Sequence, residues 1–184
     1  MCKKLVSMFL VVVMFSFSLT AFAAPTTSDQ TRNLLTSDID NASKITYFPD
    51  GSKLITSKVI IKPQTNSSLS TNMYAASSSY VTTAGQQSYY VEADGQLKFI
   101  YYLWGDFQIN PGVSATCTKA YHGFVCYDSN WSLFDYSDTF SNQGSSATAY
   151  GSYICKHYLL FITLKTTSDN LSVTGYSSGS FVTA

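Results

Sequence analysis

Apolar and aromatic runs separated by turn residues follow one another along the chain from residue 44 to its end. The pair Asp94-Gly95 joins the runs 89–93 and 96–109, and it is typical of a β-hairpin with a type I′ turn. The next turn, Asn-Pro-Gly at 110–112, has proline and glycine where a type II turn prefers them. The apolar residues of these runs do not recur with the period of a helix. The pattern therefore predicts an all-β fold.

A first hairpin is predicted over residues 44–62, where Pro49-Asp50-Gly51 separates two short extended runs. Further strands are predicted at 113–118, 124–127, 131–136, 147–155, 158–164, 171–176 and 181–183. Short strands at this spacing favour an antiparallel β-sandwich (immunoglobulin-like) or a barrel, with about 7 to 9 strands.

The first 23 residues have the three parts of an export signal. Lys3 and Lys4 carry positive charge, the run 5–17 is apolar apart from two serines, and Ala21-Phe22-Ala23 fits a cleavage site. An uncleaved membrane anchor is the alternative, but such an anchor needs about 20 apolar residues. We therefore predict a signal peptide over 1–23, cleavage after Ala23, and a secreted, extracellular protein.

Changes in composition along the chain predict its domain organisation. Residues 24–43 are rich in Ser, Thr, Asp and Asn, and we expect a flexible N-terminal tail there. A single β-rich domain is expected over 44–184, consisting of the hairpin 44–62, a loop over 63–80 and the main sheet body over 81–184. The polar part of 63–80 is also compatible with a domain linker, and a short helix fits either polar segment.

Charge and hydropathy restrict the partners. The chain has 11 basic and 11 acidic residues, and only 12% of its residues are charged, so we expect no nucleic-acid partner. After the export signal no apolar run is long enough to cross a bilayer, and we expect no membrane partner after cleavage. The partners left are a cell-wall polysaccharide or an extracellular protein.

Three cysteines follow the export signal: Cys117, Cys126 and Cys155. An exported protein meets oxidising conditions, which favour a disulfide. Cys117 and Cys126 flank a turn predicted at 120–123, and a hairpin register would place them opposite one another, so this pair is the first candidate. Pairing of either one with Cys155, or three reduced thiols buried as small apolar groups, are the alternatives.

Histidine chemistry is scarce, because the chain has only His122 and His157. A dyad of Cys155 and His122 lacks the local sequence of a cysteine-protease family. Cys155 with His157 would supply two metal ligands, which is too few for a site. We therefore expect no metal and no cofactor.

The carboxylates offer one arguable pair. A glycosidase needs two carboxyl groups that face each other across a cleft. Asp106 with Asp135 or Asp138 is the combination that the strands allow, and nothing in the sequence fixes the separation of the two groups. The chain has no P-loop, calcium loop or Gly-x-Ser-x-Gly elbow. We therefore predict no catalytic residues and a protein that is not an enzyme.

Alternation of side chains along the run 98–109 distinguishes two faces of one strand. The odd positions are predicted to face the core; they are Phe99, Tyr101, Leu103, Phe107 and Ile109. The even positions combine aromatic rings with polar groups, as surfaces that bind sugars or proteins do. The candidate binding residues on this even face are Tyr102, Trp104, Asp106 and Gln108. The alternative is that both faces are buried; Trp131 is predicted to lie in the core.

Three short segments resemble known proteins: Ser-Ala-Thr-Cys-Thr at 114–118, Asp-Ser-Asn-Trp-Ser at 128–132, and Ser-Ala-Thr-Ala-Tyr-Gly at 146–151. Together with the export signal and the polar front part, they make residues 95–184 resemble uncharacterised small secreted β-rich proteins of Gram-positive bacteria. The resemblance implies an exported β-sandwich-like domain with no assigned activity and no catalytic residues to carry over.

The sequence favours a secreted, non-catalytic binding or interaction module that acts at the cell surface or in the medium. A bacteriocin-like or toxin effector is one alternative, suggested by small size, export and low charge. A self-associating structural protein is another, because sheets with few charged edge residues tend to pair edge to edge.

Overall fold

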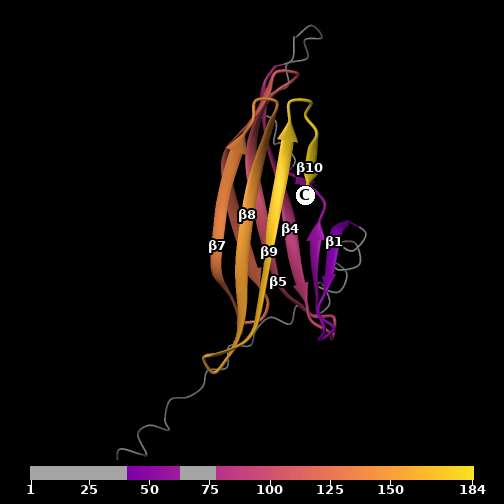
Figure 1. Cartoon of the computed structure of the whole chain (residues 1–184), viewed down its shortest axis with the longest axis vertical. Helices are drawn as coiled ribbons and strands as arrows, with labels where there is room; N and C mark the ends of the chain where they lie inside the picture. Colours follow the sequence, from indigo (N-terminus) through magenta and orange to yellow (C-terminus); the bar gives the residue numbers. More distant parts are fainter. Residues whose placement is uncertain (1–40, 63–77) are drawn as a thin grey trace, which may run out of the picture.

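The computed structural model describes residues 41–62 and 78–184. The predicted signal peptide 1–23, almost all of the predicted tail 24–43 and most of the predicted loop 63–80 lie outside the described residues. Within them, ten strands form two antiparallel sheets that do not close into a barrel (Figure 1). The all-β prediction is confirmed, and the structure is consistent with the β-sandwich.

The two sheets are built from strands that follow one another along the chain, so each is a meander rather than the Greek key of an immunoglobulin domain. The first sheet has six strands in the order β1-β2-β4-β5-β6, with β3 also paired to β4. Its strands are β1 (Ala42–Tyr47), β2 (Lys53–Ser57), β3 (Ile60–Ile61), β4 (Tyr80–Val91), β5 (Leu97–Asn110) and β6 (Ser114–Cys126). The second sheet has the order β10-β9-β8-β7. Its strands are β7 (Trp131–Asn142), β8 (Ser146–Leu159), β9 (Ile162–Tyr176) and β10 (Phe181–Thr183).

The turn predicted at 120–123 is absent, because β6 continues through it. β6 pairs with β5 along its whole length, and a bulge opposite Asp106 and Phe107 takes up one extra residue. Tyr121 and Gly123, which lie within the predicted turn, are paired with Trp104 and Tyr102.

The turn between β4 and β5 lies at Asp94-Gly95 as predicted, but it is not of type I′. That type needs a positive φ at both central residues, and here Gly95 has a φ of 83° while Asp94 has no positive φ. The first predicted hairpin is also formed, with β1 and β2 joined through Gly51 at a φ of 82°.

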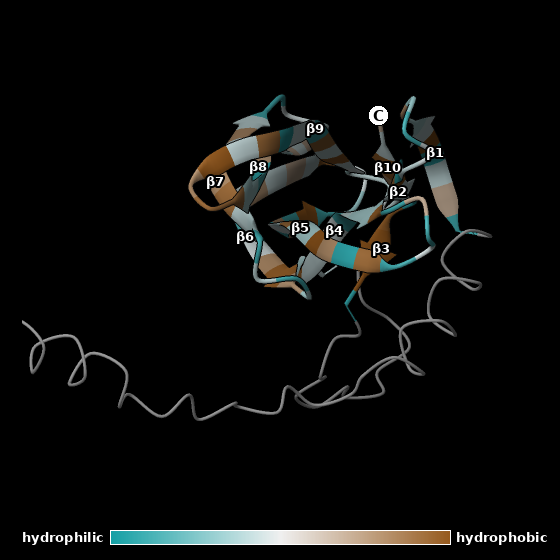
Figure 2. Ribbon diagram, turned by 90° about the horizontal axis from the view of Figure 1, so that it is seen from below, coloured by the Kyte–Doolittle hydropathy of each residue, from teal (hydrophilic) through white to brown (hydrophobic). Residues whose placement is uncertain are grey.

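The core lies between the two sheets, which face one another when the molecule is seen along its strands (Figure 2). The five odd positions of β5 are all fully buried, as the alternation predicts. Phe99 stacks on Tyr90, with ring centroids 5.3 Å apart, and its ring centroid lies 5.3 Å from that of Trp131. Aromatic pairs of this kind contribute about 0.5–1.5 kcal/mol each beyond burial. Trp131 is 3% exposed, so its predicted place in the core is confirmed.

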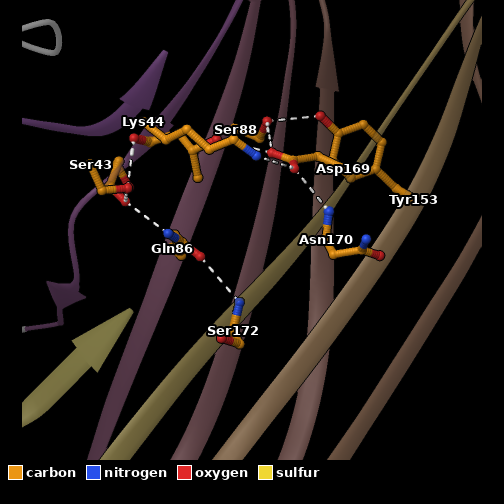
Figure 3. A network of polar contacts seen from close by, with 10 residues as sticks. Ser43, Lys44, Gln86, Ser88, Tyr153, Asp169, Asn170 and Ser172 are labelled. Atoms are coloured by element: carbon orange, nitrogen blue, oxygen red, sulfur yellow. Dashed lines mark hydrogen bonds and ion pairs between the residues drawn. The ribbon is translucent and has the colours of Figure 1, made fainter. Parts of the chain in front are cut away.

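A polar network joins the sheets where β1, β2 and β4 approach β9 (Figure 3). Asp169 Oδ2 accepts hydrogen bonds from Thr56 Oγ1 at 2.9 Å and from Ser88 Oγ at 3.3 Å, and Ser88 also bonds the Tyr153 hydroxyl at 2.8 Å. Lys44 lies 3.8 Å from the other carboxylate oxygen of Asp169. Asp169, on β9 of the second sheet, is therefore hydrogen-bonded by side chains of the first sheet, which helps to fix the relative position of the two sheets.

Gln86 makes a second link between the sheets. It is fully buried, and its side-chain amide donates to Ser57 O at 3.0 Å while its amide oxygen accepts from Ser172 N at 3.1 Å (Figure 3). Both ends of the amide are satisfied, as a buried amide requires.

Candidate functional site

The predicted binding residues lie on the outer face of the first sheet, on β5. Tyr102, Trp104 and Asp106 are partly exposed and Gln108 is exposed, whereas the side chains between them point into the core. Successive even residues are about 6.6 Å apart along a strand, so the four side chains form a row about 20 Å long. The structure therefore brings all four together.

The aromatic rings lie against two glycines on the neighbouring strands, and one of these glycines makes room for its ring. Gly85 on β4 pairs with Trp104, and a Cβ atom there would lie only 2.3 Å from Cε3 of the indole, so the Trp104 ring covers Gly85. Gly123 on β6 pairs with Tyr102, and a Cβ atom there would lie 3.6 Å from the phenol ring. The rings thus spread sideways over the sheet.

The rings of Tyr102 and Trp104 are nearly parallel on the outer face of the sheet. Their ring planes differ by 12°, and their centroids are 6.3 Å apart. Lys62 Nζ lies over the Trp104 ring at 4.0 Å and over the Tyr121 ring at 5.6 Å. A cation in this place is held by the ring quadrupole. The name aromatic platform is used below for Tyr102, Trp104 and Tyr121.

Asp106 is held in place at the end of the aromatic platform. Its Oδ1 accepts a hydrogen bond from Thr83 Oγ1 at 2.7 Å, and the Tyr121 hydroxyl donates to the same oxygen at 3.5 Å. Neither of these two bonds uses the second carboxylate oxygen, Oδ2. Asp106 therefore presents a positioned acceptor beside the rings.

The structure does not bring Asp106 together with Asp135 or Asp138, the carboxylate pair that the sequence allowed. Asp106 lies on the outer face of the first sheet, and Asp135 lines a groove on the second sheet. Asp138 lies between the sheet edges, where its Oδ2 is 2.6 Å from His122 Nδ1 and its Oδ1 accepts from the Tyr101 hydroxyl at 3.3 Å. The three carboxyl groups thus occupy separate places.

His122 and Asp138 form a pair that the sequence did not reveal. The His122 ring stacks on Tyr101 with an interplanar angle of 4°, and its centroid is 3.9 Å from that of Tyr136. Burial, with the charge of Asp138 as a smaller cause, raises the pKa of the Tyr101 hydroxyl, so it stays protonated and donates. The aromatic contacts make this pair a link between β6 and β7, the edge strands of the two sheets.

The predicted disulfide between Cys117 and Cys126 is wrong. Both residues lie on β6, and nine steps along a continuous strand separate them by about 30 Å, whereas the Cα atoms of a disulfide are roughly 4.4–6.8 Å apart. All three described thiols are free, with Cys126 exposed and the other two buried. Burial raises the pKa of Cys117 to about 11 and that of Cys155 to about 12, so both stay protonated and unreactive.

Cys155 and His157 do not form a metal site with other ligands, since no group of three or more His, Cys, Asp or Glu side chains gathers within the described ranges 41–62 and 78–184. The His157 ring instead stacks on Trp131, with centroids 5.1 Å apart and planes 8° apart.

A polar groove on the second sheet was also missed by sequence reasoning. One part has a volume of about 520 Å³ and another about 390 Å³, and both are lined by Ser137, Ser152 and Asn170 from β7, β8 and β9. Alternating serines and threonines along these strands are the signal that could have indicated it.

The turn between β8 and β9 is the other missed feature. It falls inside the run predicted as a strand at 158–164, and Leu160 and Phe161 occupy it with positive φ angles of 47° and 70°. The Phe161 side chain is fully exposed. The hydropathy colouring marks this hairpin end in brown beside the label of β7 (Figure 2).

Comparison of the chain with protein-family models, curated proteins and solved structures found no match. In the part of the chain that the structure describes, no helix has the length and apolar character needed to cross a membrane.

Proposed function

We propose that this chain is a secreted, non-catalytic binding domain that binds a polysaccharide at the cell surface or in the medium. The observation that carries the proposal is the aromatic platform, in which the nearly parallel rings of Tyr102 and Trp104 lie on the outer face of the first sheet. The polar side chains of Asp106 and Gln108 continue the same row.

Aromatic planes next to polar acceptors suit a sugar. One face of a pyranose ring presents C–H groups, and the negative face of an aromatic ring attracts them. The hydroxyl groups at the rim of the sugar need acceptors such as the Asp106 carboxylate, which is already positioned by Thr83. An extended row of these groups on an open surface fits a polymer better than a small molecule, which prefers an enclosed pocket.

Lys62 takes part in this proposal because its ammonium group lies over the Trp104 ring. A sugar that stacks on Trp104 displaces this ammonium group, which then donates hydrogen bonds to hydroxyl groups of the glycan. The Lys62→Ala substitution is expected to leave stacking intact and to change retention less than any loss of the ring.

The test is retention of the exported protein on insoluble cell-wall material and on a panel of insoluble polysaccharides. The Trp104→Ala variant is expected to lower the affinity about tenfold or more, which corresponds to roughly 1.4 kcal/mol of binding free energy. Trp104→Phe keeps an aromatic face and is expected to retain part of the affinity. Tyr150→Ala removes a partly exposed ring from the second sheet and is the matched control.

The comparison requires folded variants, checked by circular dichroism and thermal unfolding. Loss of retention in Trp104→Ala, with normal retention in Tyr150→Ala, supports the proposal. Absence of retention of the unmodified protein on every matrix, or equal loss in both variants, overturns it. N-terminal sequencing of the same exported protein tests the predicted cleavage, which leaves Ala24 as the first residue.

A further inference from the structure

The end of the β8–β9 hairpin exposes an unusual concentration of apolar side chains. Exposed fractions range from 53% to 101% for five large residues: Leu159, Leu160, Phe161, Ile162 and Leu164. Large exposed apolar patches on soluble proteins mark sites of interaction with proteins or membranes. These five residues are called the apolar tip below.

The apolar tip projects beyond the rest of the second sheet (Figure 1). Trp131, at the start of β7, pairs with His157, so β7 provides no partner for the hairpin beyond that point. On the other side, β10 pairs with β9 only at residues 173–175. The final turn is therefore a free two-stranded hairpin, closed by the pair Leu159 and Ile162.

The turn itself is strained by its own residues. Two-residue hairpin turns with positive φ at both positions strongly prefer Asn-Gly, yet here they hold Leu160 and Phe161. Positive φ is rare for bulky residues and is often kept at functional sites. Neither side chain gains burial in return, because they are 83% and 101% exposed. The apolar character of this turn therefore has no use in folding.

We propose that the apolar tip inserts into the interfacial region of a lipid bilayer and so holds the domain at a membrane surface. The tip is apolar at the turn and along both strands that lead to it, so its occupant must surround it. A bilayer does this without a matching cavity. Three residues on each side of the turn extend about 10 Å along a strand, and interfacial segments reach about 5–10 Å into the boundary of headgroups and acyl chains.

The charges at this end of the molecule give no preference for anionic lipid over neutral lipid. Among the residues that the structure describes there, four acidic residues, Asp50, Glu92, Asp94 and Asp128, are balanced by four lysines, Lys53, Lys98, Lys156 and Lys165. Lys98 already pairs with Glu92 at 3.2 Å and Asp128 at 3.1 Å, and Lys165 pairs with Asp50. Insertion is therefore driven by apolar area, with little dependence on salt. This contact departs from the expectation of no membrane partner after cleavage. That expectation rested on the absence of an apolar run long enough to cross a bilayer, and an interfacial contact needs no such run.

The decisive variant is Leu160→Asn combined with Phe161→Gly, which removes the apolar side chains and supplies the residues that the turn prefers. Exported protein is mixed with large phosphatidylcholine vesicles and with vesicles that contain one third phosphatidylglycerol, and bound protein is measured by sedimentation. The double variant is expected to bind phosphatidylcholine about tenfold less tightly or worse. Val113→Asn removes an apolar side chain that is 75% exposed in the β5–β6 turn, at the opposite end, and is the matched control.

A tryptophan probe places the tip directly. Phe161→Trp is expected to show a blue shift of its emission on addition of vesicles, and quenching by lipids that carry a quencher near the headgroup. The same substitution at Val113 is expected to show neither change. The fold of every variant is checked by circular dichroism before binding is measured.

The proposal is supported by loss of binding in the double variant, unchanged binding of Val113→Asn, and similar binding to the two vesicle types at low and high salt. It is overturned by absence of binding to both vesicle types, or by equal binding of the double variant. Binding to anionic vesicles alone that disappears with salt also overturns it. A dimer that the double variant loses, without vesicle binding, identifies a second copy as the occupant and overturns it as well.

Discussion

Two hairpin ends at the same end of the molecule are built in opposite ways (Figure 1). The β4–β5 turn holds Asp94 and Gly95, with the one positive φ at the glycine. The β8–β9 turn holds Leu160 and Phe161, both with positive φ. A left-handed conformation costs an L-residue about 1–2 kcal/mol, whereas glycine adopts it freely. The residues of the first turn thus suit its backbone conformation, and those of the second turn do not.

The surroundings of the two turns differ as well. Next to the β4–β5 turn, Tyr90 and Phe99 stack on one another in the core and are fully buried. Next to the β8–β9 turn, the pair Leu159 and Ile162 is more than half exposed. The first hairpin end stabilises the fold, while the second presents side chains to the surroundings. Strain that folding does not require is consistent with a role in binding.

The largest effect expected from this comparison is that of removing one phenylalanine from each hairpin. Phe99→Ala is expected to lower the free energy of unfolding by about 3–5 kcal/mol, because it leaves a cavity in the aromatic core. Phe161→Ala is expected to change it by less than about 0.5 kcal/mol, since an exposed side chain loses no packing. Denaturant unfolding of both variants measures the difference.

A large loss of stability in Phe161→Ala would show that the apolar tip packs against the protein. In that case the contrast between the two hairpin ends would be wrong. As a control, the slope m of the unfolding free energy against urea concentration should be the same in both variants and in the unmodified protein, which shows that the two-state analysis holds.

The next effect comes from exchanging the turn residues. Leu160→Asn with Phe161→Gly is expected to raise the free energy of unfolding by about 1–2 kcal/mol, because both positions then tolerate positive φ. Gly95→Ala in the other hairpin is expected to lower it by about 1 kcal/mol, because alanine does not tolerate the φ of glycine there. Thermal and denaturant unfolding check both signs. Destabilisation by the Asn-Gly turn would contradict the strain assigned to Leu160 and Phe161.

The same contrast explains what the sequence could and could not predict. The Asp94-Gly95 turn was predictable because aspartate and glycine are the residue types that turn conformations favour. The run from Tyr158 to Leu164 has the composition of a strand, so the turn inside it carried no local signal. The predicted turn near Gly123 failed for the converse reason, because that glycine has no positive φ and is paired with Tyr102 inside a continuous strand.

The candidate site shows the same limit. Alternation on one strand correctly separated the buried odd face of β5 from the partly exposed face with Tyr102 and Trp104. Gly85 and Lys62, which lie under and over the Trp104 ring, come from other segments. Their contacts depend on strand register, which a single sequence specifies only through the complete fold.

The smallest effect expected concerns the ion pair at the base of the β8–β9 hairpin. Asp50, in the β1–β2 turn, pairs with Lys165 on β9. The Lys165 hydrogen bond, assisted by Ser52, holds the pKa of Asp50 well below its usual value of 3.8. A lowered folded-state pKa stabilises the fold above about pH 4, and this contribution is lost as the pH falls further and Asp50 becomes protonated. Unfolding followed from about pH 6 to about pH 2 should therefore show a smaller acid-induced loss in Asp50→Asn than in the unmodified protein.

Asp94→Asn is the matched control from the other hairpin. The Asp94 carboxylate accepts the backbone N–H of Gln96 at 2.9 Å, a bond that the amide oxygen of asparagine can also accept. Asp94→Asn is expected to follow the acid dependence of the unmodified protein. An Asp50→Asn curve that coincides with the unmodified one would mean that the pair with Lys165 adds nothing in solution, as exposed ion pairs often do not. The base of the β8–β9 hairpin would then be held by strand pairing alone, which sharpens its contrast with the core-anchored β4–β5 hairpin.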